Sequence, residues 1–194
     1  MINQVDLMGV IEKYRGDAVI VPTMRATVGW KEVSNNIKRD IGISGAMGKT
    51  SSFALGVCLS QPDTKVIVFD GDGSLIMNMG TLVTIANKAP RNMYHFVMDN
   101  GIYGTTGGQP VPGNGVTNYA GLAKEAGYAS SYEFDDLEEF STQAAQIFEQ
   151  PGPVLVSIKT VPNIRLAEER IATRSGAGRS LNEAVSDLRN EFGA

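Results

Sequence analysis

The chain has 194 residues, of which 42% are hydrophobic and 20% charged, as in an ordinary soluble globular domain. A net charge of −4 without a basic stripe argues against a nucleic-acid partner. A single cysteine, Cys58, excludes an internal disulfide and an iron–sulfur cluster held by this chain, and a single histidine, His95, excludes a multi-histidine metal site. The sequence shows neither a run for a membrane span nor a signal-peptide pattern, so we expect a cytoplasmic protein with no membrane partner.

Strands and helices are predicted to alternate along the chain. Short apolar runs rich in β-branched residues predict strands that are covered on both faces, as in a parallel sheet. These runs are 18–21, 66–69, 94–98 and 154–158, with weaker candidates at 41–43 and 128–133. The alternation predicts an α/β domain with three layers, α/β/α, and a mainly parallel sheet.

Apolar residues at helical spacing fill the intervals between the strands. Three such faces are Leu7, Val10, Ile11 and Tyr14; Leu75, Met79, Leu82, Val83 and Ala86; and Leu137, Phe140, Ala144, Ile147 and Phe148. Asp135 with Glu138 predicts the start of the third helix.

The pattern changes after Pro162, so we expect a domain over 1–162 and a C-terminal extension over 163–194. The extension has the mobile-looking composition TRSGAGRS at 173–180, and then one amphipathic helix with a capping box from Ser180 and Glu183.

The glycines gather between 42 and 121, and four familiar motifs fail there. A P-loop ending at 48–50 would need glycine where Ile43 stands, and a dinucleotide fingerprint would need it at Ile76. An EF-hand loop fails at Leu75 and Thr81. His95 lies inside an apolar strand, which favours a core residue over a member of a catalytic triad.

Two polar turns follow neighbouring predicted strands. The sequence DGDGS at 70–74 ends one strand and begins a helix, and Asp99 and Asn100 end the next strand, 28 residues after Asp72. Because parallel strands end at the same edge of a sheet, Asp72 and Asn100 are expected to lie close together. A carboxylate and an amide oxygen suit Mg²⁺ that bridges to phosphate, while the helix start offers N–H groups to the anion.

These residues resemble the pyrophosphate-binding domain of thiamine diphosphate enzymes, whose signature is GDG followed at a similar interval by a pair ending in Asn. The resemblance covers about 15–160 and includes GAMGKTSSFALGV, FDGDGSLIMNMGTL and MDNGIYGTTGGQP. It is closest to the β subunits of two-chain 3-phosphonopyruvate and 3-sulfopyruvate decarboxylases. Asp99 departs from the family pattern, which usually has Asn there.

The resemblance implies thiamine diphosphate and Mg²⁺ as cofactors. It implies that the metal ligands are the Asp72 carboxylate, the Asn100 side-chain oxygen and the Ile102 carbonyl. Further cofactor contacts are implied along the two turns, with backbone N–H groups of Gly73 and Ser74, and the Ser74 hydroxyl, directed to the diphosphate. The implied cofactor-binding set on these turns is Gly71, Asp72, Gly73, Ser74, Asn100, Ile102, Tyr103 and Gly104.

The stretch Gly45, Ala46 and Met47 matches the family segment that holds the aminopyrimidine. The resemblance implies two catalytic contributions. The Gly45 carbonyl accepts a hydrogen bond from the 4′-amino group, and Met47 holds the cofactor bent so that this nitrogen reaches C2. Thr106 and Gln109, in the glycine-rich loop that follows the metal turn, are weaker substrate-contact candidates.

The glutamate that the family places on N1′ of the pyrimidine belongs to a separate domain, which nothing in this sequence resembles. We therefore expect one subunit of a hetero-oligomer, two of each chain, that shares its active site with a pyrimidine-binding partner subunit. The implied reaction is decarboxylation of a small 2-oxoacid. A carboligase subunit and a non-catalytic regulatory subunit remain alternatives, whereas the single cysteine argues against a ferredoxin oxidoreductase β subunit. Arg25 and Lys49 are candidates for binding an anionic substrate group.

Overall fold

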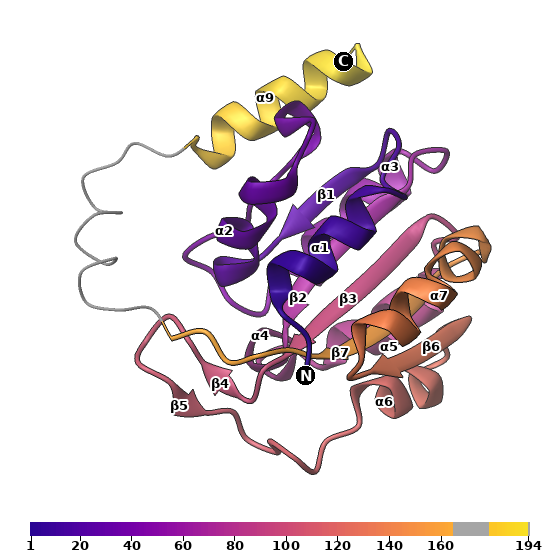
Figure 1. The fold of residues 1–194 in the computed structure, drawn as a ribbon. Helices are drawn as coiled ribbons and strands as arrows, with labels where there is room; N and C mark the ends of the chain where they lie inside the picture. Colours follow the sequence, from indigo (N-terminus) through magenta and orange to yellow (C-terminus); the bar gives the residue numbers. More distant parts are fainter. Residues whose placement is uncertain (165–178, 194) are drawn as a thin grey trace.

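A computed structural model describes residues 1–164 and 179–193 of the chain. Its centre is a parallel sheet of five strands in the order β1-β2-β3-β7-β6 (Figure 1). The strands are β1 (Val19–Pro22), β2 (Val66–Gly71), β3 (Met93–Asp99), β6 (Ser130–Phe134) and β7 (Val154–Lys159). A separate antiparallel pair, β4 (Ile102–Tyr103) and β5 (Gln109–Pro110), projects beyond the end of β3.

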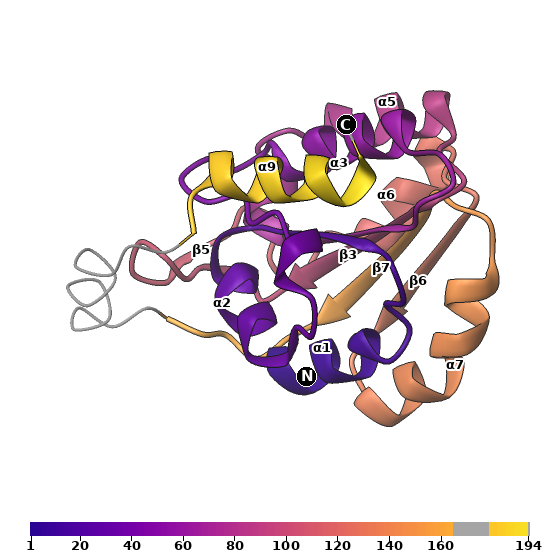
Figure 2. The ribbon, with the colours of Figure 1, turned by 90° about the horizontal axis from the view of Figure 1, so that it is seen from above.

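Helices cover both faces of the sheet, and the view from above shows the three layers (Figure 2). One face carries α1 (Gln4–Glu12), α2 (Met24–Val33) and α7 (Leu137–Glu149). The other carries α3 (Thr50–Ser60), α4 (Asp72–Ile76), α5 (Gly80–Lys88), α6 (Tyr119–Ala126) and α9 (Leu181–Phe192), with the short 3-10 helix η1 (Ile37–Arg39) beneath α9. The predicted α/β fold with a mainly parallel sheet is confirmed.

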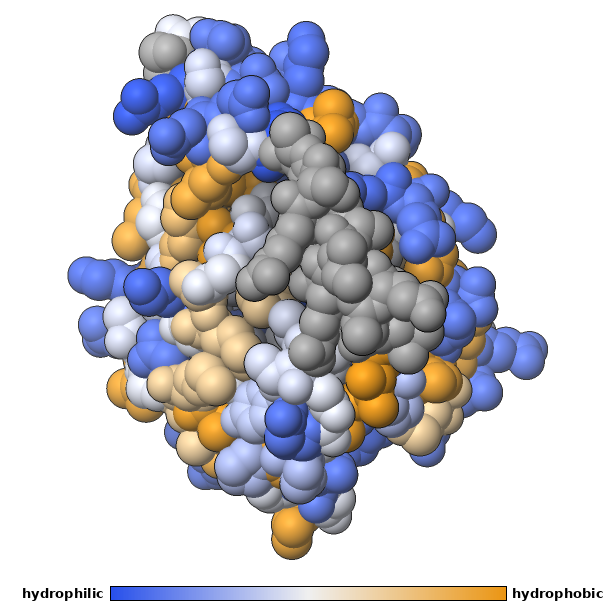
Figure 3. Space-filling model, turned by 90° about the vertical axis from the view of Figure 1, so that its left-hand side faces the viewer, coloured by the Kyte–Doolittle hydropathy of each residue, from blue (hydrophilic) through white to orange (hydrophobic). Residues whose placement is uncertain are grey.

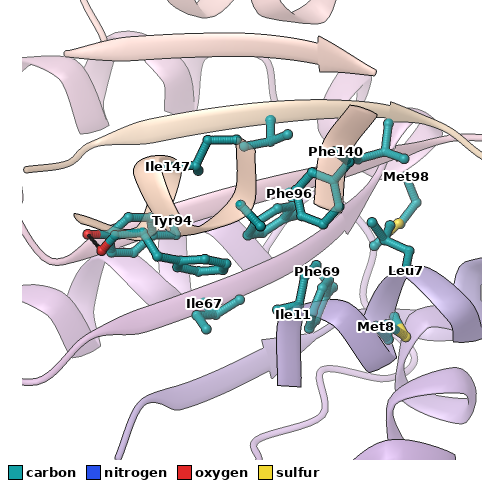
Figure 4. Packing of buried hydrophobic residues seen from close by; sticks show 14 of the residues in the cluster. Leu7, Met8, Ile11, Ile67, Phe69, Tyr94, Phe96, Met98, Phe140 and Ile147 are labelled. Carbon is teal, nitrogen blue, oxygen red and sulfur yellow. Dashed lines mark hydrogen bonds between the residues drawn. The ribbon is translucent and has the colours of Figure 1, made fainter. Parts of the chain in front are cut away.

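Side chains of the buried strands point alternately to the two faces of the sheet and form a hydrophobic core on each. Phe69 and Phe96 belong to the core on the side of α1 and α7, with ring centroids 5.8 Å apart (Figure 4). Phe96 also packs edge-on against Phe140 of α7, with centroids 6.1 Å apart. Val68 and Val97 point the opposite way, toward α3 and α6. Burial on both faces explains why these strands read as continuous apolar runs rather than as alternating patterns.

Three sequence predictions of local structure are wrong. The segment 41–43 forms no strand: Asp40, just before it, and Ile43, its last residue, make isolated parallel bridges to Ile20 and Thr23. The apolar face predicted over 75–86 is interrupted, because the chain leaves α4 after Ile76 and begins α5 at Gly80; Met79 and Val83 are 41% and 62% exposed. The cap of α7 is Asp136, one residue later than predicted, and its carboxylate accepts the N–H of Glu139.

The C-terminal helix α9 packs against η1 and buries Ala184 and Leu188 in the core beside α3. The predicted capping box of Ser180 and Glu183 is confirmed. Most of the stretch 173–180 lies outside the described residues, so that prediction is not tested. Within the described ranges, none of the helices combines the length and the apolar character needed to cross a lipid bilayer.

Candidate functional site

An open cavity lies at the carboxyl ends of β1, β2 and β3. It is lined by Gln4, Thr23, Met24, Arg25, Ala26, Met47, Asp70, Gly71, Asp72, Gly73, Ser74, Met98, Asn100, Ile102, Tyr103, Gly104, Thr105 and Thr106. Among the coloured residues on the face in Figure 3, white and tan ones lie near the middle and the deep blue of polar residues lies toward the edge. Carboxyl ends of parallel strands are where α/β proteins bind ligands.

Asp72 is the acidic centre of this cavity and is 2% exposed. It begins α4 directly after β2, so its carboxylate lies where the backbone N–H groups of a helix start are unpaired. One carboxylate oxygen accepts the N–H of Gly73 at 2.8 Å and the other accepts the N–H of Gly101 at 2.7 Å. Burial raises the pKa of Asp72 to about 6, although these hydrogen bonds lower it. A cation at this carboxylate would offset the cost of burying its charge.

Asn100 lies in the adjoining turn, as the parallel pairing of β2 and β3 requires. Its side-chain oxygen accepts the N–H of Ile102 at 2.9 Å, which fixes the turn and leaves a second lone pair on that oxygen. The described residues contain no cluster of three or more His, Cys, Asp or Glu side chains suited to a metal. One buried carboxylate with neutral oxygens is the kind of donor set that Mg²⁺ takes when phosphate and water complete its shell. The site therefore fits that ion.

Asp99, the departure from the family pattern, is 5% exposed and forms an ion pair with Lys159. The register of β3 and β7 places the two residues side by side. Burial alone would lower the pKa of Lys159, but the hydrogen bond and charge of Asp99 outweigh it and raise that pKa. The pairing explains how a second acid next to Asn100 is accommodated without placing an uncompensated charge beside Asp72.

Gly73 lets the Tyr103 ring approach the backbone of the Asp72 turn closely. A Cβ on Gly73 would lie 2.8 Å from Cδ1 of Tyr103, closer still to Cε1, and 3.1 Å from Cγ2 of Val111. The Tyr103 ring therefore packs directly on the turn, as an alanine would not allow. Ser74 is 2% exposed, and its hydroxyl oxygen accepts the N–H of Gly48 at 3.0 Å, so it joins the turn to the 45–48 loop.

The loop predicted to hold an aminopyrimidine lies beside the turn. Met47 lines the cavity, whereas Gly45 and Ala46 are not among the lining residues. Gly45 and Gly48 both have left-handed backbone, with φ of +74° and +73°, and the Gly48 carbonyl accepts a hydrogen bond from the Asn78 side chain at 2.9 Å. Glycines at these two positions let the loop turn sharply, so that Met47 faces the cavity between them.

Of the two candidates for substrate contact, Thr106 and Gln109, the structure places one in the cavity wall. Thr106 lines the cavity, and Gln109 does not. Gln109 lies in β5, where its side-chain oxygen accepts a 2.8 Å hydrogen bond from the Thr106 hydroxyl and its amide nitrogen donates to the Thr106 carbonyl at 3.2 Å. In this arrangement Gln109 supports the loop that presents Thr106.

Sequence reasoning missed the contribution of the segment after β1. Thr23, Met24 and Ala26 line the cavity, as does Arg25, which was singled out by location alone. Met24 has a φ of +44°, an unusual value for a residue with a side chain, and such strain often marks functional sites. The available signal was the position of the segment at the carboxyl end of a predicted strand, because TMRA carries no recognisable motif.

Below the turn, Asp70 and His95 are fully buried, with Nε2 of His95 3.6 Å from a carboxylate oxygen of Asp70. The other ring nitrogen of His95 lies 3.3 Å from the Tyr128 hydroxyl. The remaining carboxylate oxygen of Asp70 accepts the N–H of Gly71 at 3.0 Å. The prediction that His95 is a core residue is confirmed, and the core polar group that contains it supports the turn from beneath.

Comparison with known proteins identifies the family. Residues 6–158 match the thiamine pyrophosphate enzyme, C-terminal TPP binding domain, and the chain belongs to this family. The phosphonopyruvate decarboxylase of Streptomyces hygroscopicus is 36% identical over 118 residues, 61% of this chain and 29% of that protein. The sulfopyruvate decarboxylase subunit beta of Methanocaldococcus jannaschii is 37% identical over 125 residues, 64% of this chain and 65% of that subunit. The resemblance stated from the sequence is confirmed.

The chain thus spans less than a third of the length of the first relative and just under two thirds of the second. Among solved structures, a thiamine diphosphate-dependent 4-hydroxybenzoylformate decarboxylase from Rhodococcus jostii RHA1 superposes with a TM-score of 0.71 at 21% identity. That match covers 84% of this chain and 33% of the other. The two proteins share the fold of this domain.

Proposed function

We propose that this chain is the cofactor-binding subunit of a thiamine diphosphate- and Mg²⁺-dependent 2-oxoacid decarboxylase. The observation that carries the proposal is the buried Asp72 carboxylate facing the Asn100 turn at the edge of a cavity. The names of the two relatives, phosphonopyruvate decarboxylase and sulfopyruvate decarboxylase subunit beta, support a 2-oxoacid with an anionic tail as substrate.

Each residue of the site has a proposed role. Asp72, Asn100 and the Ile102 carbonyl would hold Mg²⁺, and the N–H group of Ser74 would bind the diphosphate. The N–H of Gly73, which the sequence also suggested for this role, donates to the Asp72 carboxylate in this structure. When bound, thiamine diphosphate supplies an electron sink for the carbon–carbon bond that breaks as carbon dioxide leaves.

The pyrimidine end of the site is assigned to the 45–48 loop. The Gly45 carbonyl would accept a hydrogen bond from the 4′-amino group and Ala46 would lie next to it, although neither residue lines the cavity in this structure. Met47, which lines the cavity, would orient the cofactor by packing against it, so the chain would contribute orientation rather than a reacting group. Tyr103 and Gly104 close the other side, and Thr106 meets the substrate.

The chain is proposed to work with a pyrimidine-binding partner subunit. Both acidic side chains that line the cavity, Asp70 and Asp72, belong to the β2 turn, and within the described ranges the lining includes no glutamate. We assign the acid that would meet N1′ of the pyrimidine to that partner subunit. The designation of one relative as a subunit beta supports this arrangement.

The test is a product assay on the complex of this chain with the partner subunit, supplied with thiamine diphosphate and Mg²⁺. 3-Phosphonopyruvate, 3-sulfopyruvate and pyruvate are offered separately, and carbon dioxide, aldehyde and hydroxyketone are measured. Carbon dioxide and aldehyde in equal amounts are expected. A hydroxyketone as the main product would instead indicate a carboligase, and no turnover despite cofactor binding would indicate a regulatory subunit.

A further inference from the structure

Arg25 supplies the basic side chain among the described residues that line the cavity. It lies in the first turn of α2, directly after β1, and β1 pairs with β2, whose end carries the Asp72 turn. Lys49, the other cation suggested by the sequence, is exposed at the start of α3 and does not line the cavity. The structure thus separates two residues that the sequence alone left equivalent.

The backbone and the side chain of Arg25 are both held in place. The Gln4 side chain, which also lines the cavity, donates to the Arg25 carbonyl at 3.3 Å. Nη2 of Arg25 donates to the side-chain oxygen of Asn163 at 2.8 Å. The aliphatic stem passes close to Gly104, since a Cβ there would lie 4.0 Å from Cγ of Arg25. A guanidinium has five N–H donors in a planar fork, so it can hold Asn163 and a second acceptor together.

The negative charge expected in the cavity favours a cationic side chain such as that of Arg25. Its lining includes the acidic residue Asp72, with Asp70 buried directly below it, and the proposed ligands add a diphosphate and a phosphonate or sulfonate. A single divalent cation does not balance these negative charges. Arginine binds tetrahedral oxyanions through charge-assisted, often bidentate hydrogen bonds, which are the strong ones in a site shielded from water.

We propose that Arg25 binds a tetrahedral oxyanion inside this cavity. The oxyanion comes from one of two sources that share this chemistry: the diphosphate of the cofactor or the anionic tail of the substrate. The inference rests on the proposed function for the identity of those two ligands.

The experiment compares Arg25→Met, which keeps the apolar stem, with Arg25→Lys and with Lys49→Met as the matched control on a charge outside the cavity. All variants are assembled with the partner subunit, and thermal unfolding confirms that they fold. The first arm titrates thiamine diphosphate with Mg²⁺ by calorimetry. The second arm measures kcat/KM for 3-sulfopyruvate and for pyruvate, which lacks the anionic tail.

If Arg25 binds the diphosphate, Arg25→Met weakens cofactor binding about 10- to 100-fold. If it binds the substrate tail, the affinity for cofactor is unchanged and the 3-sulfopyruvate to pyruvate ratio of kcat/KM falls by a similar factor. In either case Arg25→Lys restores part of the loss and Lys49→Met changes nothing.

Unchanged cofactor affinity together with an unchanged substrate ratio would overturn the inference, as would an equal effect of Lys49→Met. A wild-type complex that binds the cofactor but turns over neither 2-oxoacid would refute the proposed function instead. In that case calorimetry with thiamine diphosphate and with 3-sulfopyruvate, on wild type and Arg25→Met, decides the role of Arg25 without turnover: a loss of affinity for either ligand supports it, and no loss overturns it.

Discussion

Replacing Gly73 by alanine tests the close packing of Tyr103 on the turn that begins with Asp72. The new Cβ would lie 2.8 Å from Cδ1 of Tyr103 and 3.1 Å from Cγ2 of Val111. Overpacking of this kind costs about 1–3 kcal/mol. The lower backbone entropy of alanine in a helix returns about 0.5–1 kcal/mol. We therefore expect Gly73→Ala to destabilise the protein by about 1–2 kcal/mol, which for this length lowers Tm by roughly 2–8 °C.

Gly71→Ala is the matched control, because a Cβ on Gly71, two residues earlier in the same turn, would meet nothing within 4 Å. Its expected effect is about 0.5 kcal/mol or less. The assay is thermal and urea unfolding without cofactor, followed by calorimetry with thiamine diphosphate and Mg²⁺, in which Gly73→Ala should bind more weakly. Adding Tyr103→Ala to Gly73→Ala should recover part of the lost stability. Equal Tm values for Gly73→Ala and Gly71→Ala would refute the reasoning.

Three further predictions concern the surroundings of the site. Lys159→Met leaves the buried Asp99 without its partner and should lower the free energy of unfolding in urea by about 1–3 kcal/mol at pH 7. Because the folded pKa of Lys159 is raised, the ion pair stabilises the wild type below about pH 10, and the difference from the variant should shrink as the pH rises past that folded pKa. A difference that does not change with pH would count against the ion pair. Burial raises the pKa of Cys58 to about 12, so at pH 8 the thiol of the native protein should react with iodoacetamide at least about 100-fold more slowly than the thiol in urea. Mass spectrometry follows the labelling, and rapid labelling of the native protein would contradict the burial of Cys58. Gly56→Ala, in α3 where a Cβ would meet nothing within 4 Å, should raise stability by about 0.5–1 kcal/mol, and a loss of stability would contradict the placement of Gly56 in an open helical position.

The core of the site was predictable because it depends on local order along the chain. Asp72 and Asn100 each follow a buried strand, and the parallel pairing of those strands brings them together. The sheet itself followed from apolar runs that are buried on both faces.

Other parts depend on register or on tertiary contacts that a sequence does not display. The pairing of Asp99 with Lys159 requires the alignment of β3 with β7, two strands that are not consecutive in the chain. The position of Arg25 depends on the approach of Asn163 and Gln4 from distant parts of the chain.

The break between α4 and α5 was hidden for a different reason. Apolar residues continue at helical spacing through 75–86, but Met79 and Val83 are exposed on the surface rather than packed in the core. Periodicity reports which residues are apolar and not which of them are covered.

The most direct test of the central claim is calorimetric titration of thiamine diphosphate, with and without Mg²⁺, into this chain alone and into its complex with the partner subunit. We expect tight binding that requires both Mg²⁺ and the partner, because this chain is proposed to hold the diphosphate and metal end of a shared site. Tight binding to this chain alone would contradict the shared site, and absence of binding to the complex would contradict the assignment of the cavity to this cofactor.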